Sequence, residues 1–138
     1  MKASHLISFA LGAMLVLGMS TISHSNAQSP NHVYELRTYH ASAGKLEDLK
    51  ARFRDHTVDI FNRHNMKSIG YWVPQQNTDN VLIYVLQHPS RAEADKNWAA
   101  FNADPEWVKV KTASEANGKL VDKVDRVFMD PADFSALK

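Results

Sequence analysis

Glu35, Arg37 and Tyr39 alternate along the segment 33–40, whose β-branched and aromatic residues predict a strand. Alternate residues of a strand point to one face of the sheet, so these three side chains share a face. If the strand is central in its sheet, that face is buried, and buried charges must be paired or used. The pattern favours either an anion-binding or acid–base site or a structural ion pair, and the sequence alone leaves both open.

Two histidines form a second candidate group on a helix predicted over residues 45–64. At about 100° per residue, His56 and His64 both lean toward the apolar stripe of this helix and therefore toward the sheet. A histidine in a pocket there is suited to proton transfer near neutral pH, and the alternative is a hydrogen-bonded residue at the edge of the core. Their separation, ~12 Å along the axis, is too long for one ion, so no metal site is predicted.

Aromatic residues are the third candidate group. Trp72, Trp98, Trp107, Tyr71 and Tyr84 either line a cavity for a flat apolar ligand or form ordinary core. A phosphate-binding glycine loop, a serine elbow and a His-Glu-x-x-His motif are all missing from the sequence, and no cofactor is predicted. The candidate pocket or ion-pair residues are thus Glu35, Arg37, Tyr39, His56, His64, Tyr84 and Trp98.

The composition limits the classes of protein to consider. With 138 residues, 44% of them hydrophobic and 22% charged, the chain is sized and composed for one globular domain. A formal net charge of +1 gives no indication of the basic surface with which proteins bind nucleic acid. The absence of cysteine excludes disulfides, cysteine-type zinc sites and thiol nucleophiles.

The first 27 residues have the layout of a secretory signal peptide. Lys2 precedes a largely apolar run over residues 6–19, and Ser25-Asn26-Ala27 has the small residues that signal peptidase accepts. The apolar run is shorter than the ~20 residues that a membrane-spanning helix needs. We expect cleavage after Ala27 and export of residues 28–138 to the periplasm or the extracellular space, with no membrane attachment afterwards.

Sequence patterns over residues 28–138 predict one α+β domain. Ser90 and Asp104 are predicted helix caps, the first with Glu93 in a capping box and the second with proline at the first helical position. The second of these helices is expected to end near residues 117–118. The predicted order is strand 33–40, helix 45–64, strands 68–73 and 81–86, the two capped helices, and strand 120–129. This βαββαβ order is that of a ferredoxin-like fold, a four-stranded antiparallel sheet with helices on one face.

Such a fold leaves the other face of its sheet without helices. The segment 81–86 is an unbroken apolar run, which is typical of a strand covered on both faces. A second copy of the chain, packed sheet against sheet, is the simplest cover. The sequence therefore predicts a homodimer.

Short motifs follow one another along the chain in a distinctive order: Tyr34-Glu35-Leu36-Arg37-Thr38-Tyr39, Gly44-Lys45-Leu46, Gly70-Tyr71-Trp72, Arg91-Ala92, Trp98 and Ala103-Asp104-Pro105-Glu106-Trp107. In this order they resemble the NIPSNAP family. The terminal segment 131–137 is similar to that family's Pro-Thr-Asp-Phe-Ser-Pro-Leu, with Ala132 and Ala136 as the departures. The resemblance covers nearly all of the predicted mature chain and implies a dimeric α+β barrel.

Two classes of function remain open at this point. One is a secreted homodimer that binds a small apolar or aromatic ligand or a protein partner. The alternative is a small enzyme, similar to the cofactor-independent monooxygenases or haem-binding and haem-degrading proteins that share the dimeric barrel, with its site between helices and sheet. The missing catalytic motifs favour the binding protein.

Overall fold

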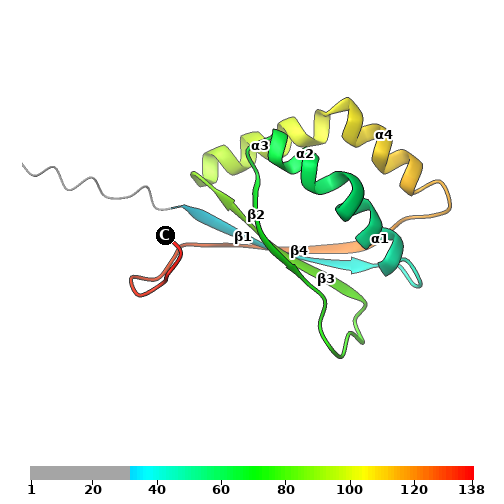
Figure 1. Ribbon diagram of the computed structural model, residues 1–138, viewed down its shortest axis with the longest axis horizontal. Coiled ribbons are helices and arrows are strands. Elements are labelled where there is room, and N and C mark those ends of the chain that lie inside the picture. Colours follow the sequence, from blue (N-terminus) through cyan, green and yellow to red (C-terminus); the bar gives the residue numbers. More distant parts are fainter. Residues whose placement is uncertain (1–31) are drawn as a thin grey trace, which may run out of the picture.

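Residues 32–138 are described by the structure, a computed structural model, and form one antiparallel sheet with helices on one face (Figure 1). The sheet has four strands in the order β2-β3-β1-β4. In chain order the elements are β1 (Val33–Ala41), α1 (Leu46–Arg52), η1 (Phe53–Thr57), α2 (Val58–Arg63), β2 (Lys67–Trp72), β3 (Val81–His88), α3 (Arg91–Ala103), α4 (Pro105–Ser114) and β4 (Val121–Met129).

This arrangement confirms the predicted ferredoxin-like fold. β1 lies between β3 and β4 and pairs with both in antiparallel register, so it is central as expected. Both predicted caps are present: the Ser90 hydroxyl accepts from the Glu93 backbone N–H, and Asp104 accepts from the N–H groups of Glu106 and Trp107. α4 ends earlier than predicted, at Ser114.

The predicted helix over 45–64 contains a π-helical turn. α1 passes into the five-residue π-helix η1 and then into α2 without leaving the helical path. A π-helical turn holds more residues than an α-helical turn, so it shifts the phase of every later residue relative to a 3.6-residue period. The apolar positions Leu49, Phe53 and Ile60 are still buried, but His56, inside the π turn, is exposed. The prediction that His56 leans toward the sheet is therefore wrong.

Side-chain parity on β3 separates the two faces of the sheet. Leu82, Tyr84 and Leu86 point to the helices and belong to the main hydrophobic core. Ile83 and Val85 alternate with them, so they point to the opposite face, where they are only partly buried. Trp72 pairs with Ile83 in the register and is 51% exposed on that same face. No described helix covers this face, which we call the open face (Figure 1).

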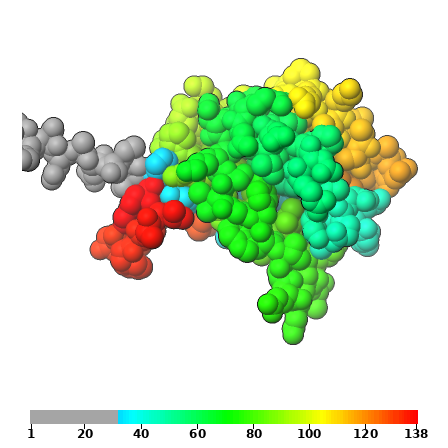
Figure 2. Space-filling view, viewed as in Figure 1, coloured from blue at the N-terminus to red at the C-terminus, as the bar shows by residue number. Residues whose placement is uncertain are grey.

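The C-terminal segment after β4 lies beside the start of β1, as the red and blue atoms of Figure 2 show. The Tyr34 hydroxyl donates to the backbone carbonyl of Lys138 at 3.1 Å, which ties the two ends of the described chain together. The loop between β2 and β3 protrudes from the body in the same view. Within residues 32–138, no helix has the length and apolarity to span a bilayer. The predicted signal peptide lies outside the described residues.

Candidate functional site

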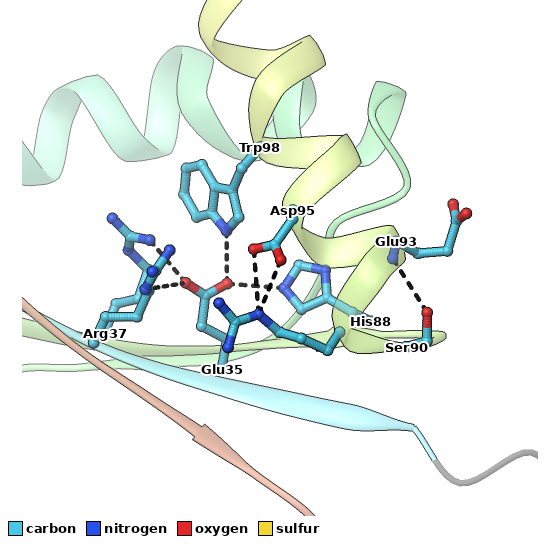
Figure 3. A network of polar contacts seen from close by, with 9 residues as sticks. Glu35, Arg37, His88, Ser90, Glu93, Asp95 and Trp98 are labelled. Carbon is cyan, nitrogen blue, oxygen red and sulfur yellow. Dashed lines mark hydrogen bonds and ion pairs between the residues drawn. The ribbon is translucent and has the colours of Figure 1, made fainter.

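A fully buried carboxylate is the centre of the candidate site. Glu35, on β1, is 0% exposed and lies under α3 (Figure 3). Its Oε1 accepts from Arg37 Nη1 at 2.8 Å, and its Oε2 accepts from Trp98 Nε1 at 2.6 Å. His88 Nε2, at the end of β3, lies 2.9 Å from the same Oε2. Three elements therefore converge on one carboxylate, and all its partners come from side chains.

These contacts keep Glu35 charged. Burial acts to raise the pKa of Glu35, but the hydrogen bonds from His88, Trp98 and Arg37 outweigh it, so the pKa lies below its ordinary value. Arg37 is also held by the ring of Trp98, which lies 4.1 Å from the guanidinium carbon. The ion pair predicted from the alternation of Glu35 and Arg37 is confirmed, with the two side chains 0% and 12% exposed.

Some polar atoms around this carboxylate are buried without a partner. Among the described residues, Arg37 Nε, the Tyr84 hydroxyl and His88 Nδ1 are buried and form no hydrogen bond. Burial raises the pKa of Tyr84 well above its ordinary value, so its hydroxyl stays protonated. Unsatisfied buried groups are rare in proteins and often mark places where a ligand or water binds. The network around Glu35 thus holds Arg37 rigidly while leaving one of its donors free.

A cavity of about 600 Å³ opens next to Arg37, between α3, α4 and the β1–β4 edge of the sheet. It exists because the helices do not close over β4. Val124 and Arg126 pair with Tyr39 and Arg37, so they share the helix-facing side of the sheet. They are nevertheless 39% and 44% exposed, which leaves a recess where a core would otherwise continue.

The walls of this cavity combine aromatic rings with arginines. Trp98, Phe101 and Trp107 line it from α3 and α4, and the rings of Phe101 and Trp107 lie 4.5 Å apart. Arg52 lines it from the end of α1, only 5% exposed, with its guanidinium 5.2 Å from the Trp107 ring. A volume of this size, with flat apolar walls and a few fixed polar groups, is typical of small-molecule sites.

Five of the seven predicted site residues lie together. Glu35, Arg37 and Trp98 are in direct contact, and Tyr39 and Tyr84 pack on each other with ring centroids 5.2 Å apart. The Arg37 guanidinium carbon also lies 5.5 Å from the centre of the Tyr39 ring. Of the five, Arg37, Tyr39 and Trp98 line the cavity. Trp107 joins them there, whereas Trp72 lies on the open face.

The two predicted histidines lie elsewhere. His56 is exposed on a surface groove between η1 and α4. His64 is partly buried and lies 2.7 Å from the Asp104 carboxylate, with its ring against Phe101. The hydrogen bond with His64 is the main cause that lowers the Asp104 pKa to about 2. His64 thus joins the end of α2 to the cap of α4, which is the structural alternative given for it.

His88 is the residue that sequence reasoning missed. It lies two residues beyond the strand predicted over 81–86, but it is 0% exposed and contacts Glu35 and the ring of Phe128. The alternation of side chains along the strand indicates this position. His88 follows Tyr84 and Leu86 at two-residue steps and therefore shares their face. Extending the third strand by two residues would have placed it against the helices.

Comparisons with known proteins agree with this fold. The family model named NIPSNAP matches residues 34–136. A NIPSNAP family protein of unknown function from Agrobacterium tumefaciens is similar, with 23% identity over 80% of this chain and 96% of that one and a TM-score of 0.69. An uncharacterised NIPSNAP domain protein from Burkholderia xenovorans gives 21% identity, coverages of 75% and 97%, and a TM-score of 0.64.

A third similar structure is that of SnoaB, a cofactor-independent oxygenase from Streptomyces nogalater. It has 14% identity over 78% of this chain and 99% of that one, with a TM-score of 0.52, which supports the shared fold alone. No curated protein matches the chain. Because the family model covers most of the sequence, including β1 with Glu35 and Arg37, the chain belongs to the NIPSNAP family.

Proposed function

We propose that this chain is an exported protein that binds a small ligand and functions as a homodimer. The ligand occupies the cavity between α3, α4 and the β1–β4 edge of the sheet. The observation that carries this proposal is the pairing of that cavity of about 600 Å³ with Arg37, a rigidly held arginine with a free buried Nε. The buried ion pair of Arg37 therefore borders an open recess and not a continuous core.

The open face supports the homodimer. Trp72 and Val127, on two different strands, are 51% and 52% exposed there, and Ile83 and Val85 lie between them across the sheet. Large apolar patches of this kind are uncommon on monomers and are typical of interfaces. A second copy related by two-fold symmetry would bring the same apolar residues together. The signal peptide layout of residues 1–27 supports export.

The enzyme alternative has less support. It requires Trp98 and the helix histidines His56 and His64 in the pocket; Trp98 lines the cavity, but neither histidine does. The described residues that do line it include no histidine, so a haem-binding role has no imidazole ligand there. Similarity of fold to an oxygenase does not transfer its activity.

Filling the cavity tests the binding function. Val124→Trp places an indole in the recess, whereas Val108→Trp adds the same group to the exposed side of α4, outside the lining. We expect native mass spectrometry of protein purified from its own cells to show an additional small-molecule mass on the wild type and on Val108→Trp. Val124→Trp should lose it. An unliganded wild type, or a Val124→Trp variant that keeps the full ligand occupancy, would contradict the proposal.

A further inference from the structure

We propose that the ligand is a planar aromatic anion, with its ring against the aromatic side chains of α3 and α4 and its negative group toward the arginines of the cavity wall. This inference rests on the proposed function, because it names the class of ligand for the same cavity. Three features of the described residues carry it: the charge of the lining, the free donors of two buried arginines, and the arrangement of the aromatic rings.

Cationic side chains outnumber acidic ones around the cavity. Only Glu115 and Asp122 among the lining residues are acidic. Glu35 and Asp125 add two carboxylates from just outside the lining, since they pair with Arg37 and Lys123. An excess of positive charge remains even when these four acids are all counted. The lining cations are Arg37, Arg52, Lys111, Lys119, Lys123 and Arg126.

Two of these cations have no carboxylate partner. Within residues 32–138, Lys111 and Lys119 form no ion pair, and Arg126 Nε is 4.0 Å from Glu35 Oε1, an oxygen that also accepts from Arg37. A cavity wall with unpaired cations attracts anions, and low-dielectric surroundings strengthen that attraction. A neutral or cationic ligand would leave these charges without a counter-charge.

Two buried arginines have donors to spare. Arg37 uses Nη1 for Glu35, and Arg52 uses Nη1 for Ser114 and Glu115, but the Nε of each is buried without a partner among the described residues. A guanidinium that is already held by a carboxylate of the protein is a fixed donor. Such a fixed donor preorganises a site for an anionic ligand. Glu35 is accordingly a positioning residue for Arg37.

The rings of the cavity select a flat ligand. Trp98 lies against Arg37, and Trp107 lies against Arg52, so each tryptophan is beside a guanidinium. A planar aromatic ring gains stacking energy on such walls, in contrast to an inorganic phosphate or an aliphatic acid. A molecule that carries both an aromatic ring and a negative charge can stack on the aromatic side chains and pair with the arginines at the same time. We infer an aromatic carboxylate or an anion of similar shape.

Isothermal titration calorimetry with three probes tests this inference. 2-Naphthoate and 2-naphthamide share a ring system and differ in one negative charge, and cyclohexanecarboxylate keeps the charge without the aromatic ring. We expect the wild type to bind 2-naphthoate at least ~10-fold more tightly than either of the others, since a charge-assisted contact is strong enough for that ratio.

A matched pair of arginine variants locates the charge. Arg126 and Arg91 are both about half exposed and both lie over the Phe128 ring, but only Arg126 lines the cavity. Arg126→Gln should weaken 2-naphthoate binding about 10-fold and leave 2-naphthamide unchanged. Arg91→Gln should bind both probes as the wild type does.

The possible failures separate the two proposals. If 2-naphthamide binds as tightly as 2-naphthoate and Val124→Trp abolishes both, the cavity binds ligands but the anion inference is overturned. If cyclohexanecarboxylate binds as tightly as 2-naphthoate, the aromatic part is overturned. If no probe binds, the inference fails, and the native mass spectrum of the purified protein then decides the binding function independently. Equal loss of 2-naphthoate binding in Arg91→Gln and Arg126→Gln would assign the effect to general surface charge and would also overturn it.

Discussion

Glu35→Gln should lower the free energy of unfolding by about 3–5 kcal/mol, the cost of removing one partner from a buried ion pair. Glu35 is fully buried and accepts hydrogen bonds from Arg37 and Trp98, with His88 on the same oxygen as Trp98. Glutamine keeps the shape of the side chain but leaves the Arg37 charge without its counter-charge. Urea unfolding of the two proteins measures the difference.

A double-mutant cycle shows whether the two charges are partners. Arg37→Met combined with Glu35→Gln should cost about 0.5–3 kcal/mol less than the sum of the single changes, because each single variant strands one charge. Additive losses would mean that Glu35 and Arg37 are not coupled.

The free energy of unfolding should depend on pH through Glu35. Because the pKa of Glu35 is lowered on folding, its contribution to stability is complete above the unfolded value of about 4.5 and is lost as the pH falls. Glu35→Gln should remove this part of the acid dependence.

Leu82→Glu should destabilise the folded subunit, whereas Ile83→Glu should prevent dimer formation, although the two residues are neighbours. Leu82 points into the core and is 4% exposed, so a carboxylate there is buried without a partner and should cost ~4 kcal/mol or more. Ile83 points to the open face. Ile83→Glu should leave the monomer folded and abolish the proposed dimer. Size-exclusion chromatography with light scattering, together with urea unfolding, distinguishes the two outcomes.

The wild type is the control for the Leu82→Glu and Ile83→Glu variants. We expect the mature chain to be a dimer at micromolar concentration, because the apolar open face is otherwise in water. A stable, folded wild-type monomer at that concentration would contradict the homodimer. A dimeric Ile83→Glu variant would show that the subunits associate through another surface.

Local sequence patterns predicted most of the fold. Ser90 and Asp104 marked both helix starts correctly, because a capping side chain and the first helical turn are close in sequence. The first helix was predicted to end at residue 64, and the next residue, Asn65, has a positive φ of 55°, as is typical after a helix end. The order of the elements was enough to predict the sheet, and the alternation on β1 was enough to place Glu35 and Arg37 on one face.

The features that were missed depend on an irregular helical turn or on contacts between distant segments. The π turn displaced His56 from the face that a 3.6-residue period predicts. His88 reaches Glu35 only through the pairing of β3 with β1, where Glu35 is opposite Leu86. The cavity exists because the helices stop short of β4, and neither propensity nor periodicity reports how far a helix layer extends over a sheet.

The three tryptophans offer the most direct test of the cavity as the binding site. Trp98 and Trp107 line the cavity, and Trp72 lies on the open face. In a ¹⁵N-labelled mature chain, each indole N–H gives its own NMR resonance, which Trp→Phe variants assign. Titration with 2-naphthoate should shift the Trp98 and Trp107 resonances and leave that of Trp72 in place. A shift of Trp72 alone, with those of Trp98 and Trp107 unchanged in the bound protein, would contradict a ligand site between the helices and the sheet.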